Sequence, residues 1–239
     1  MIRKLELLGA MAGAVLAMSA VLASAAQAET GTLTAAQYPA IVTGEQPFGQ
    51  VLDIGEGPLQ KITCGSNLDA TLFGPTDPVT FQPTYNNCVS DPAQTPVTIT
   101  MNGCDYTVGF TKPGTTGTPF TTGTMHAWIN CPAGQQIEIH VYLDQFQHAA
   151  NMSTCTYDIG PQGPVPAGIY HNTMVGIPDV DATINARFTA RSTLGAGFAP
   201  CGGDPITQHL PVTLTGNYTL RGFQDFAGFE GAQQPLDVG

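Results

Sequence analysis

The chain has 239 residues and a formal net charge of −11, and only 10% of its residues are Asp, Glu, Lys or Arg. Seven Lys and Arg residues cannot supply the clustered basic surface that nucleic acids or anionic membranes require, so neither is an expected partner. Scarce Lys, Glu and Arg together with frequent Gly and Pro favour strands and turns over helices.

The N-terminus has the pattern of a secretory signal peptide. The basic pair Arg3-Lys4 precedes an uncharged run, 7–22, whose 16 residues would span roughly 24 Å as a helix, less than a ~30 Å hydrocarbon core. Ala26-Gln27-Ala28 then forms an A-x-A cleavage pattern. We therefore predict cleavage after residues 1–28, secretion to the periplasm or the medium, and no membrane insertion of the mature chain; an uncleaved anchor helix is the alternative.

Six cysteines follow the predicted cleavage point. An even number of cysteines in an oxidising compartment predicts three disulfides. Zinc ligation by the thiols is the alternative, although no two of them are spaced as C-x-x-C. The six are Cys64, Cys88, Cys104, Cys131, Cys155 and Cys201.

The first readable part of the mature chain predicts three successive strands at 59–64, 70–73 and 79–85. An up-down-up path through these strands brings Cys64 and Cys88 to the same end. We therefore predict a Cys64–Cys88 disulfide.

The next segment predicts a hairpin. Apolar and polar residues alternate over 97–101 and again over 104–110, and Asn102-Gly103 between them is a strong signal for a two-residue turn. This turn would place Ile99 opposite Tyr106, so that apolar residues share one face.

A third strand over 123–130 can be aligned in the same way. Placing Cys131 opposite Cys104 pairs Tyr106 with Ile129 and Val108 with Ala127, so apolar residues match throughout. The two cysteines then lie directly across the ladder, within reach of a Cys104–Cys131 disulfide. Cys155 and Cys201 pair by elimination.

Pro132-Ala133-Gly134 predicts a three-residue loop that leads to a fourth strand over 136–143, which completes an antiparallel meander. This register places His126 opposite His140, with Glu138 on the same face. Two imidazoles and a carboxylate can bind a divalent transition metal, so a weak surface metal site is one interpretation. The other is an ordinary solvated face, and no further cofactor is expected.

Later segments predict two more half-buried strands, at 180–188 and 212–220. The expected fold is all-β: an antiparallel sandwich or barrel of about ten strands with three disulfides. One domain would cover 33–222, or two subdomains divided near 144–152, followed by a tail over 223–239.

The region from about residue 38 to 218 resembles a family of secreted bacterial proteins with a six-cysteine β framework and no assigned function. The residues that carry the resemblance are Tyr38-Pro39-Ala40-Ile41-Val42-Thr43-Gly44, Gln82-Pro83-Thr84-Tyr85-Asn86-Asn87-Cys88, Met101-Asn102-Gly103-Cys104, Cys131-Pro132-Ala133-Gly134 and Pro161-Gln162. The resemblance implies secretion and the cysteine framework, and it brings no catalytic residues.

Other candidate chemistry is sparse. No serine lies in a G-x-S-x-G motif, although a triad could assemble in space. Asp179 and Asp181 share one side of a strand, and they fit either a Ca²⁺ site or exposed carboxylates. Asn151 and Asn217 begin glycosylation sequons that we interpret as ordinary polar sequence.

These patterns favour a non-catalytic binding or structural protein, secreted or at the cell surface, with an unknown ligand and a cell-envelope component as one candidate partner. A secreted hydrolase or metal-dependent enzyme is the alternative.

Overall fold

The computed structural model describes residues 29–46, 49–55, 60–91, 94–113, 122–142, 153–173, 176–194, 209–227 and 229–239. Every regular element in these ranges is a β-strand. No helix in this part of the chain is long and apolar enough to cross a membrane. The predicted signal peptide, the predicted division near 144–152 and Cys201 lie outside the described residues.

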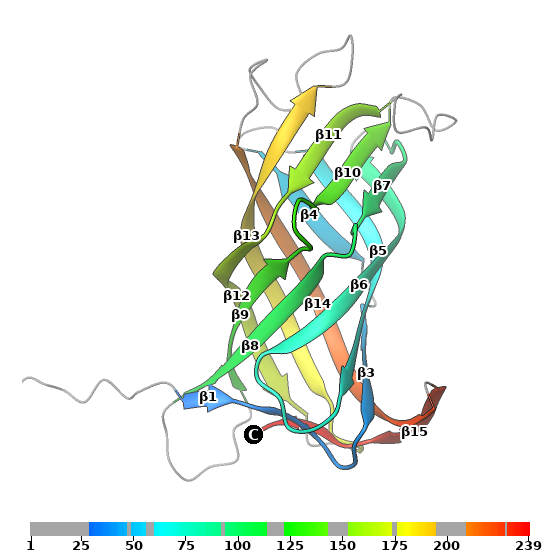
Figure 1. Cartoon of the computed structure of the whole chain (residues 1–239), viewed down its shortest axis with the longest axis vertical. Helices are drawn as coiled ribbons and strands as arrows, with labels where there is room; N and C mark the ends of the chain where they lie inside the picture. The colour runs from blue at the N-terminus through cyan, green and yellow to red at the C-terminus, as the bar shows by residue number, and fades with distance from the viewer. Residues whose placement is uncertain are drawn as a thin grey trace, which may run out of the picture.

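Eight antiparallel strands close into a barrel (Figure 1). Each strand pairs with the next around the ring, and the last pairs with the first. In ring order they are β14 (His209–Phe226), β3 (Ala40–Glu45), β5 (Gln60–Leu72), β6 (Val79–Asp91), β8 (Asp105–Lys112), β9 (Thr122–Asn130), β12 (Gln162–Asn172) and β13 (Val180–Leu194). The all-β prediction is confirmed, and of its two architectures the barrel is right and the sandwich is wrong.

Strict alternation of apolar and polar residues explains how these strands close a barrel around one core. In β13, Val180, Ala182 and Phe188 are buried, while Asp181 and Arg187 between them are exposed. Side chains of a strand alternate between its two faces, so one face lines the core and the other meets water. The predicted strands at 180–188 and 212–220 are confirmed, and they pair with each other.

Four more strands complete the upper part of the wall in Figure 1. They are β4 (Gln50–Ile54), β7 (Val97–Thr100), β10 (Ile137–Tyr142) and β11 (Ser153–Ile159). β4 continues β3, because both pair with β14 and β5. β11 pairs with the upper end of β13, β10 with β11, and β7 with β10. The lower wall of β8, β9 and β12 is therefore extended upward by β7, β10 and β11.

The predicted meander is right for one pairing and wrong for two. The β8–β9 register is as predicted, with Tyr106 opposite Ile129. The Asn102-Gly103 turn also forms, with φ of 49° and 77° and a bond from the Cys104 N–H to the Met101 carbonyl. However, β7 pairs with β10 instead of β8, and β10 does not pair with β9. Matching apolar residues could not distinguish the predicted pairing of β7 with β8 from the observed pairing with β10, because Ile99 meets an equally apolar partner, Ile139, in β10.

One junction in the wall lacks a ladder, and we call it the β6–β8 seam: residues 82–88 of β6 opposite residues 101–105. The β6–β8 ladder ends at Phe81 and Tyr106, and β6 meets the β7 side again only at the Val89–Pro96 bridge. Continuing this register would place Gln82 opposite Asp105 and then Pro83 opposite Cys104. Pro83 has no N–H to donate, and the Cys104 N–H already bonds within the turn. The ladder therefore cannot continue along the seam.

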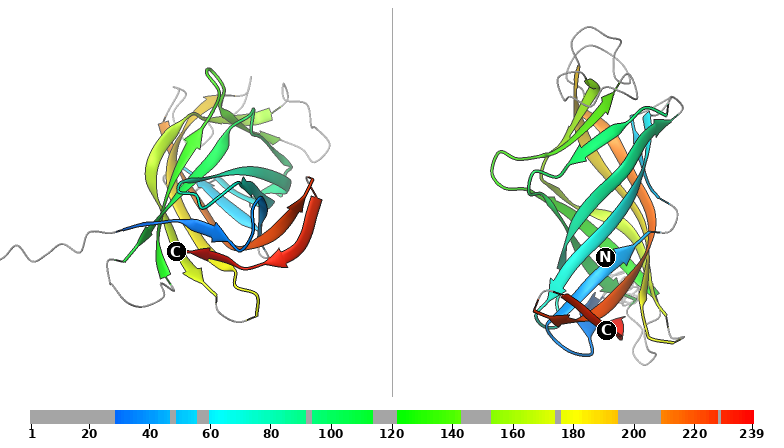
Figure 2. Two further views of the ribbon diagram at one scale, coloured as in Figure 1. Left: turned by 60° about the horizontal axis from the view of Figure 1, so that its bottom comes forward. Right: turned by 90° about the vertical axis from the view of Figure 1, so that its right-hand side faces the viewer.

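Both ends of the described chain cover the lower opening of the barrel (Figure 2). The strands involved are β1 (Glu29–Gly31), β2 (Leu33–Ala35), β15 (Phe229–Gln234) and β16 (Leu236–Val238). β1 pairs with β8, and β16 pairs with β2 in a separate two-stranded sheet. Leu33, Leu236 and Val238 are fully buried. Of the segment 223–239, expected as a tail, residues 223–226 end β14 and residues 229–234 and 236–238 form β15 and β16, with Leu236 and Val238 in the core.

Two disulfides flank the seam. Cys64–Cys88 joins β6 to β5, and Cys104–Cys131 joins the start of β8 to the end of β9. The predicted separate strands 59–64 and 70–73 are wrong, because both lie within the single strand β5. Cys155 is buried and no described cysteine is free, but its predicted partner, Cys201, lies outside the described residues.

Candidate functional site

A cavity of about 30 Å³ lies inside the barrel. Seven of the eight ring strands, all except β3, contribute at least one side chain to its lining, and β4, which continues β3, contributes Gln50. The lining comprises Gln50, Leu68, Phe81, Tyr106, Val108, Ala127, Ala167, Ile184, Ala186, Phe188, Leu214 and Tyr218. An interior position lined from around the ring is where an eight-stranded barrel can hold one small ligand.

Small side chains on one side of the barrel create this space. Ala127, Ala167 and Ala186 point inward from β9, β12 and β13, which are consecutive in the ring. In ring order these strands face β4, β5 and β6, which contribute the larger side chains Gln50 and Leu68, with Phe81. Three neighbouring alanines leave volume that the opposite wall does not fill.

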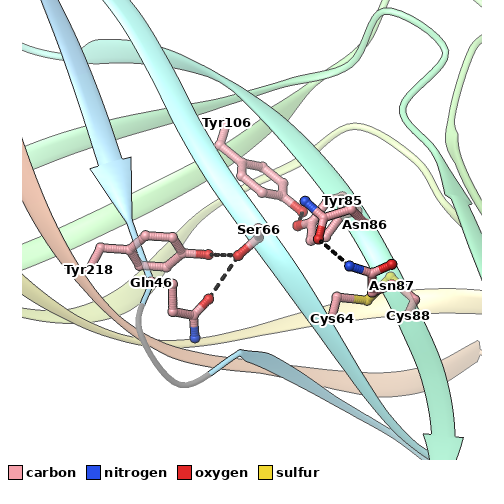
Figure 3. Close-up of a disulfide and its surroundings, with 9 residues drawn as sticks. All are labelled: Gln46, Cys64, Ser66, Tyr85, Asn86, Asn87, Cys88, Tyr106 and Tyr218. Atoms are coloured by element: carbon pink, nitrogen blue, oxygen red, sulfur yellow. Dashed lines mark hydrogen bonds between the residues drawn. A yellow bond between two sulfur atoms is a disulfide. The ribbon is translucent and has the colours of Figure 1, made fainter.

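Polar side chains gather beside the cavity at mid-height (Figure 3). Ser66 donates its hydroxyl proton to Gln46 Oε1 at 2.8 Å. The Tyr218 hydroxyl lies 2.7 Å from Ser66 Oγ. Because the single proton of Ser66 is engaged with Gln46, Tyr218 is the donor in the second bond. These three residues are therefore held in one chain of hydrogen bonds.

A second pair lies at the seam, where the hydroxyls of Tyr85 and Tyr106 are 2.7 Å apart (Figure 3). Burial raises the pKa of Tyr106 to about 12. Burial first, and then the neighbouring Tyr106 and Tyr218, raise the pKa of Tyr85 well above its usual value, while a hydrogen bond from Gln50 acts in the opposite direction. Both phenols are therefore neutral at physiological pH.

Gln50 joins this pair to the cavity. Its side chain is 1% exposed and lines the cavity, and its Oε1 has no hydrogen-bond partner. Within the described residues, every buried polar side chain is uncharged: Gln50, Ser66, Ser90, Thr107, Asn172 and Gln234. The interior thus offers neutral hydrogen-bonding groups and no ionised ones.

The predicted pairing of His126 with His140 is wrong. His126 lies in β9 between β8 and β12, whereas His140 lies in β10 between β7 and β11. Only Glu138 remains beside His140, with Glu138 Oε2 3.5 Å from His140 Nε2. In the ranges that the structure describes, no group of three His, Cys, Asp or Glu side chains is placed to hold a metal ion. The metal hypothesis therefore loses its geometric basis.

The other sequence candidates also have separate partners. Asp179 accepts a hydrogen bond from Gln233 and lies 3.6 Å from Arg221, whereas Asp181 accepts one from Thr219. The two aspartates are therefore not joined around one ion. Ser66, the buried serine beside the cavity, bonds to Tyr218 and Gln46 rather than to a histidine. Asn151 lies outside the described residues.

A second hollow, of about 390 Å³, lies on the outer face of the lower wall. Strands β3, β5, β6 and β14 line it with polar side chains that include Asp69 and Asp225. Burial raises the pKa of Asp69. No buried polar atom among the residues that line this hollow lacks a hydrogen-bond partner. The hollow therefore has no unpaired acceptor comparable to Gln50 Oε1.

Sequence reasoning missed the interior residues, although two signals were present. Gln50 begins an alternation with Leu52 and Ile54, so a polar residue occupies an inward position. Alanines at inward positions of β9 and β13 interrupt runs of larger apolar residues. Each signal becomes meaningful only when the ring order shows which walls face each other.

Comparisons with known proteins give no identification. No protein-family model matches the chain, and neither a curated protein nor a solved structure matches it. The barrel interior therefore has to be interpreted from its own chemistry.

Proposed function

We propose that this chain is a secreted, non-catalytic binding protein that holds a small neutral molecule inside its barrel. The observation that carries the proposal is the interior cavity that seven of the eight ring strands line. This cavity combines space with an unpaired buried acceptor, Gln50 Oε1. Both features favour a bound molecule.

The lining determines the charge of that molecule. Burying an ion without a partner is strongly unfavourable, and no buried side chain in the described interior carries a charge. Most residues that line the cavity are apolar, and Leu68 and Phe188 are examples. A neutral, largely apolar compound is the class that this environment stabilises.

The expected compartment agrees with this role. Disulfides persist in oxidising surroundings such as the periplasm or the medium, and Cys64–Cys88 and Cys104–Cys131 are both formed. The N-terminal pattern adds a cleaved signal peptide, and the resemblance to secreted bacterial proteins points the same way. A cell-envelope component stays a candidate source or recipient of the ligand.

The rival function is a hydrolase or metal-dependent enzyme. General acid–base chemistry or metal binding would require titratable groups that converge on one pocket. The buried polar groups of the described interior are amides and hydroxyls, and none of them is a carboxylate, an imidazole or an amine. This arrangement supports binding over catalysis.

The proposal is tested by recovering the ligand. Mature protein from a culture that produces it naturally would be heat-denatured, and released compounds would be identified by headspace gas chromatography and mass spectrometry. We expect one neutral compound at near-stoichiometric amounts, and its loss from an Ala186→Leu variant, whose larger side chain fills the cavity. No enriched compound, or equal amounts from both proteins, would contradict the proposal.

A further inference from the structure

The unpaired acceptor of Gln50 lies at the cavity rather than elsewhere in the core. Among the described residues, two buried side-chain polar atoms lack a partner: Gln50 Oε1 and the Tyr170 hydroxyl. Only Gln50 lines the cavity. A buried acceptor without a partner destabilises the protein, so a donor inside the cavity would relieve that cost.

Counting protons shows a donor next to this acceptor. Tyr85 and Tyr106 have two hydroxyl protons between them but share one hydrogen bond. Gln50 Oε1 has no hydrogen-bond partner and therefore does not accept the second proton. One phenol proton is left for another acceptor. The site thus offers one acceptor and one donor in close proximity.

A hydroxyl group matches both, because it donates one proton and accepts with two lone pairs. Carboxylates and ammonium groups do not match, because each is charged and the interior supplies no counter-charge. A cavity of about 30 Å³ corresponds to two or three water-sized positions at about 10–15 Å³ each. The matching group therefore has two or three heavy atoms.

We propose that the cavity binds a small alcohol, or the hydroxyl end of a larger one, through Gln50 and the Tyr85–Tyr106 pair. The hydroxyl donates to Gln50 Oε1 and accepts the remaining phenol proton. The attached carbons lie against Ala127, Ala167 and Ala186, where the lining is apolar. This inference rests on the proposed interior binding function and adds the chemical class of the ligand.

The experiment compares two probes, ethanol and xenon, which differ in hydrogen bonding. Each is titrated into the mature protein while NMR follows the methyl groups of Ala127, Ala167 and Ala186. The same titrations are made with Gln50→Leu, which keeps a similar size but removes the amide. We expect the Kd for ethanol to rise about 5- to 10-fold in this variant and the Kd for xenon to change less than twofold.

Two further variants guard against a folding defect at Gln50. Tyr106→Phe removes one hydroxyl of the pair and should weaken ethanol binding about threefold or more. Gln82→Leu is the matched control, because Gln82 is exposed and does not line the cavity. Its affinity for ethanol should equal that of the wild type.

The possible failures are distinguishable. If xenon reaches the alanine methyls but ethanol binds wild type and Gln50→Leu equally, the hydroxyl inference is overturned while the interior site stands. If xenon binds and ethanol does not, ordered water occupies the polar groups, and the inference is again overturned. If neither probe reaches these methyls, the proposed interior function fails as well.

Discussion

The lower and upper halves of the barrel are held together in different ways. In the lower half, β8 pairs with β9 in one unbroken register, β9 pairs with β12 across two register shifts, and the terminal strands cover the opening. Towards the upper half, the wall passes to the shorter strands β7, β10 and β11, and β6 loses its ladder at the seam. Cross-strand hydrogen bonds thus dominate below, whereas side chains and disulfides carry more of the structure at mid-height.

The position of the disulfides explains how the barrel tolerates the seam. Cys88 ties β6 to β5 on one side of the seam, and Cys104 ties β8 to β9 on the other. Neither bridge crosses the seam itself. Each anchors one of the two unpaired edges to its outer neighbour. The two disulfides therefore lie where the β6–β8 ladder is interrupted.

The largest expected effect lies in the lower half. Phe110 is 1% exposed and its ring packs edge-to-face on Tyr170, with centroids 5.4 Å apart. Phe110→Ala should reduce the free energy of unfolding by about 3–5 kcal/mol, as measured by urea denaturation. Phe73→Ala removes the same atoms from a residue that is 83% exposed and should change it by less than about 0.5 kcal/mol. Equal effects would mean that the described core is wrong.

Removing the Cys104–Cys131 disulfide beside the seam should reduce the free energy of unfolding slightly less than Phe110→Ala does. Cys104 and Cys131 close a loop with a sequence separation of 27, for which the chain-entropy model gives about 3–4 kcal/mol. The double variant Cys104→Ala, Cys131→Ala should therefore be destabilised by about this amount. Hydrogen exchange should rise in residues 82–88 and 101–105 but not in the β13–β14 ladder. A uniform rise through the barrel would remove the distinction between the two halves.

The cover of the lower opening gives a smaller effect. The Asn172 side chain donates to the Val238 carbonyl at 3.1 Å and accepts from the Val238 N–H at 3.2 Å. Asn172→Ala leaves these backbone groups unpaired in a buried position, so we expect a loss of about 1–3 kcal/mol. Asn185→Ala, on the exposed face of β13, is the control and should have little effect. If residues 229–239 are cleaved faster by protease in Asn172→Ala but not in Asn185→Ala, the destabilisation lies at the lower opening of the barrel.

The buried tyrosines should make the free energy of unfolding depend on pH in the alkaline range and not at neutral pH. Burial raises the pKa of Tyr106 and that of Tyr157 to about 12, from a usual value of 10. Because the folded state holds these protons more tightly than the unfolded state, the contribution of these tyrosines to stability should be fully present below pH 10 and be lost between about pH 10 and 12. Absorbance at 295 nm should show late tyrosinate formation. Tyr157→Phe should reduce the stability loss over this range, and an unchanged loss would contradict the assignment.

The sequence predicted local structure better than long-range pairing. The β8–β9 register and its disulfide followed from apolar matching because the two strands are close in sequence and pair directly. The same rule failed for β7 and β10, since Ile99 and Ile139 fit each other as well as they fit the expected partners. The Cys64–Cys88 bridge was predicted for the wrong reason, because β5 is one long strand rather than two.

The interior site was beyond this reasoning for a related cause. Gln50 and Ser66 come from the consecutive strands β4 and β5, but Tyr218 lies 152 residues after Ser66, and only the pairing of β14 with β3 and β4 brings it beside them. An inward glutamine in one strand and inward alanines in three others do not indicate a cavity until their relative heights are known. The break in the β6–β8 ladder at Pro83 could not be predicted for the same reason. The missing N–H of Pro83 matters only once it is known that Pro83 lies opposite Cys104.

The most direct test of the account is a crystal structure of the mature protein under xenon pressure. Xenon occupies apolar cavities without requiring hydrogen bonds, so it reports the space alone. The account predicts a xenon atom inside the barrel within about 4.5 Å of the Ala127, Ala167 and Ala186 side chains, and none there in Ala186→Leu. Xenon found only at the surface, with the interior filled, would contradict the claim that this barrel encloses a ligand site.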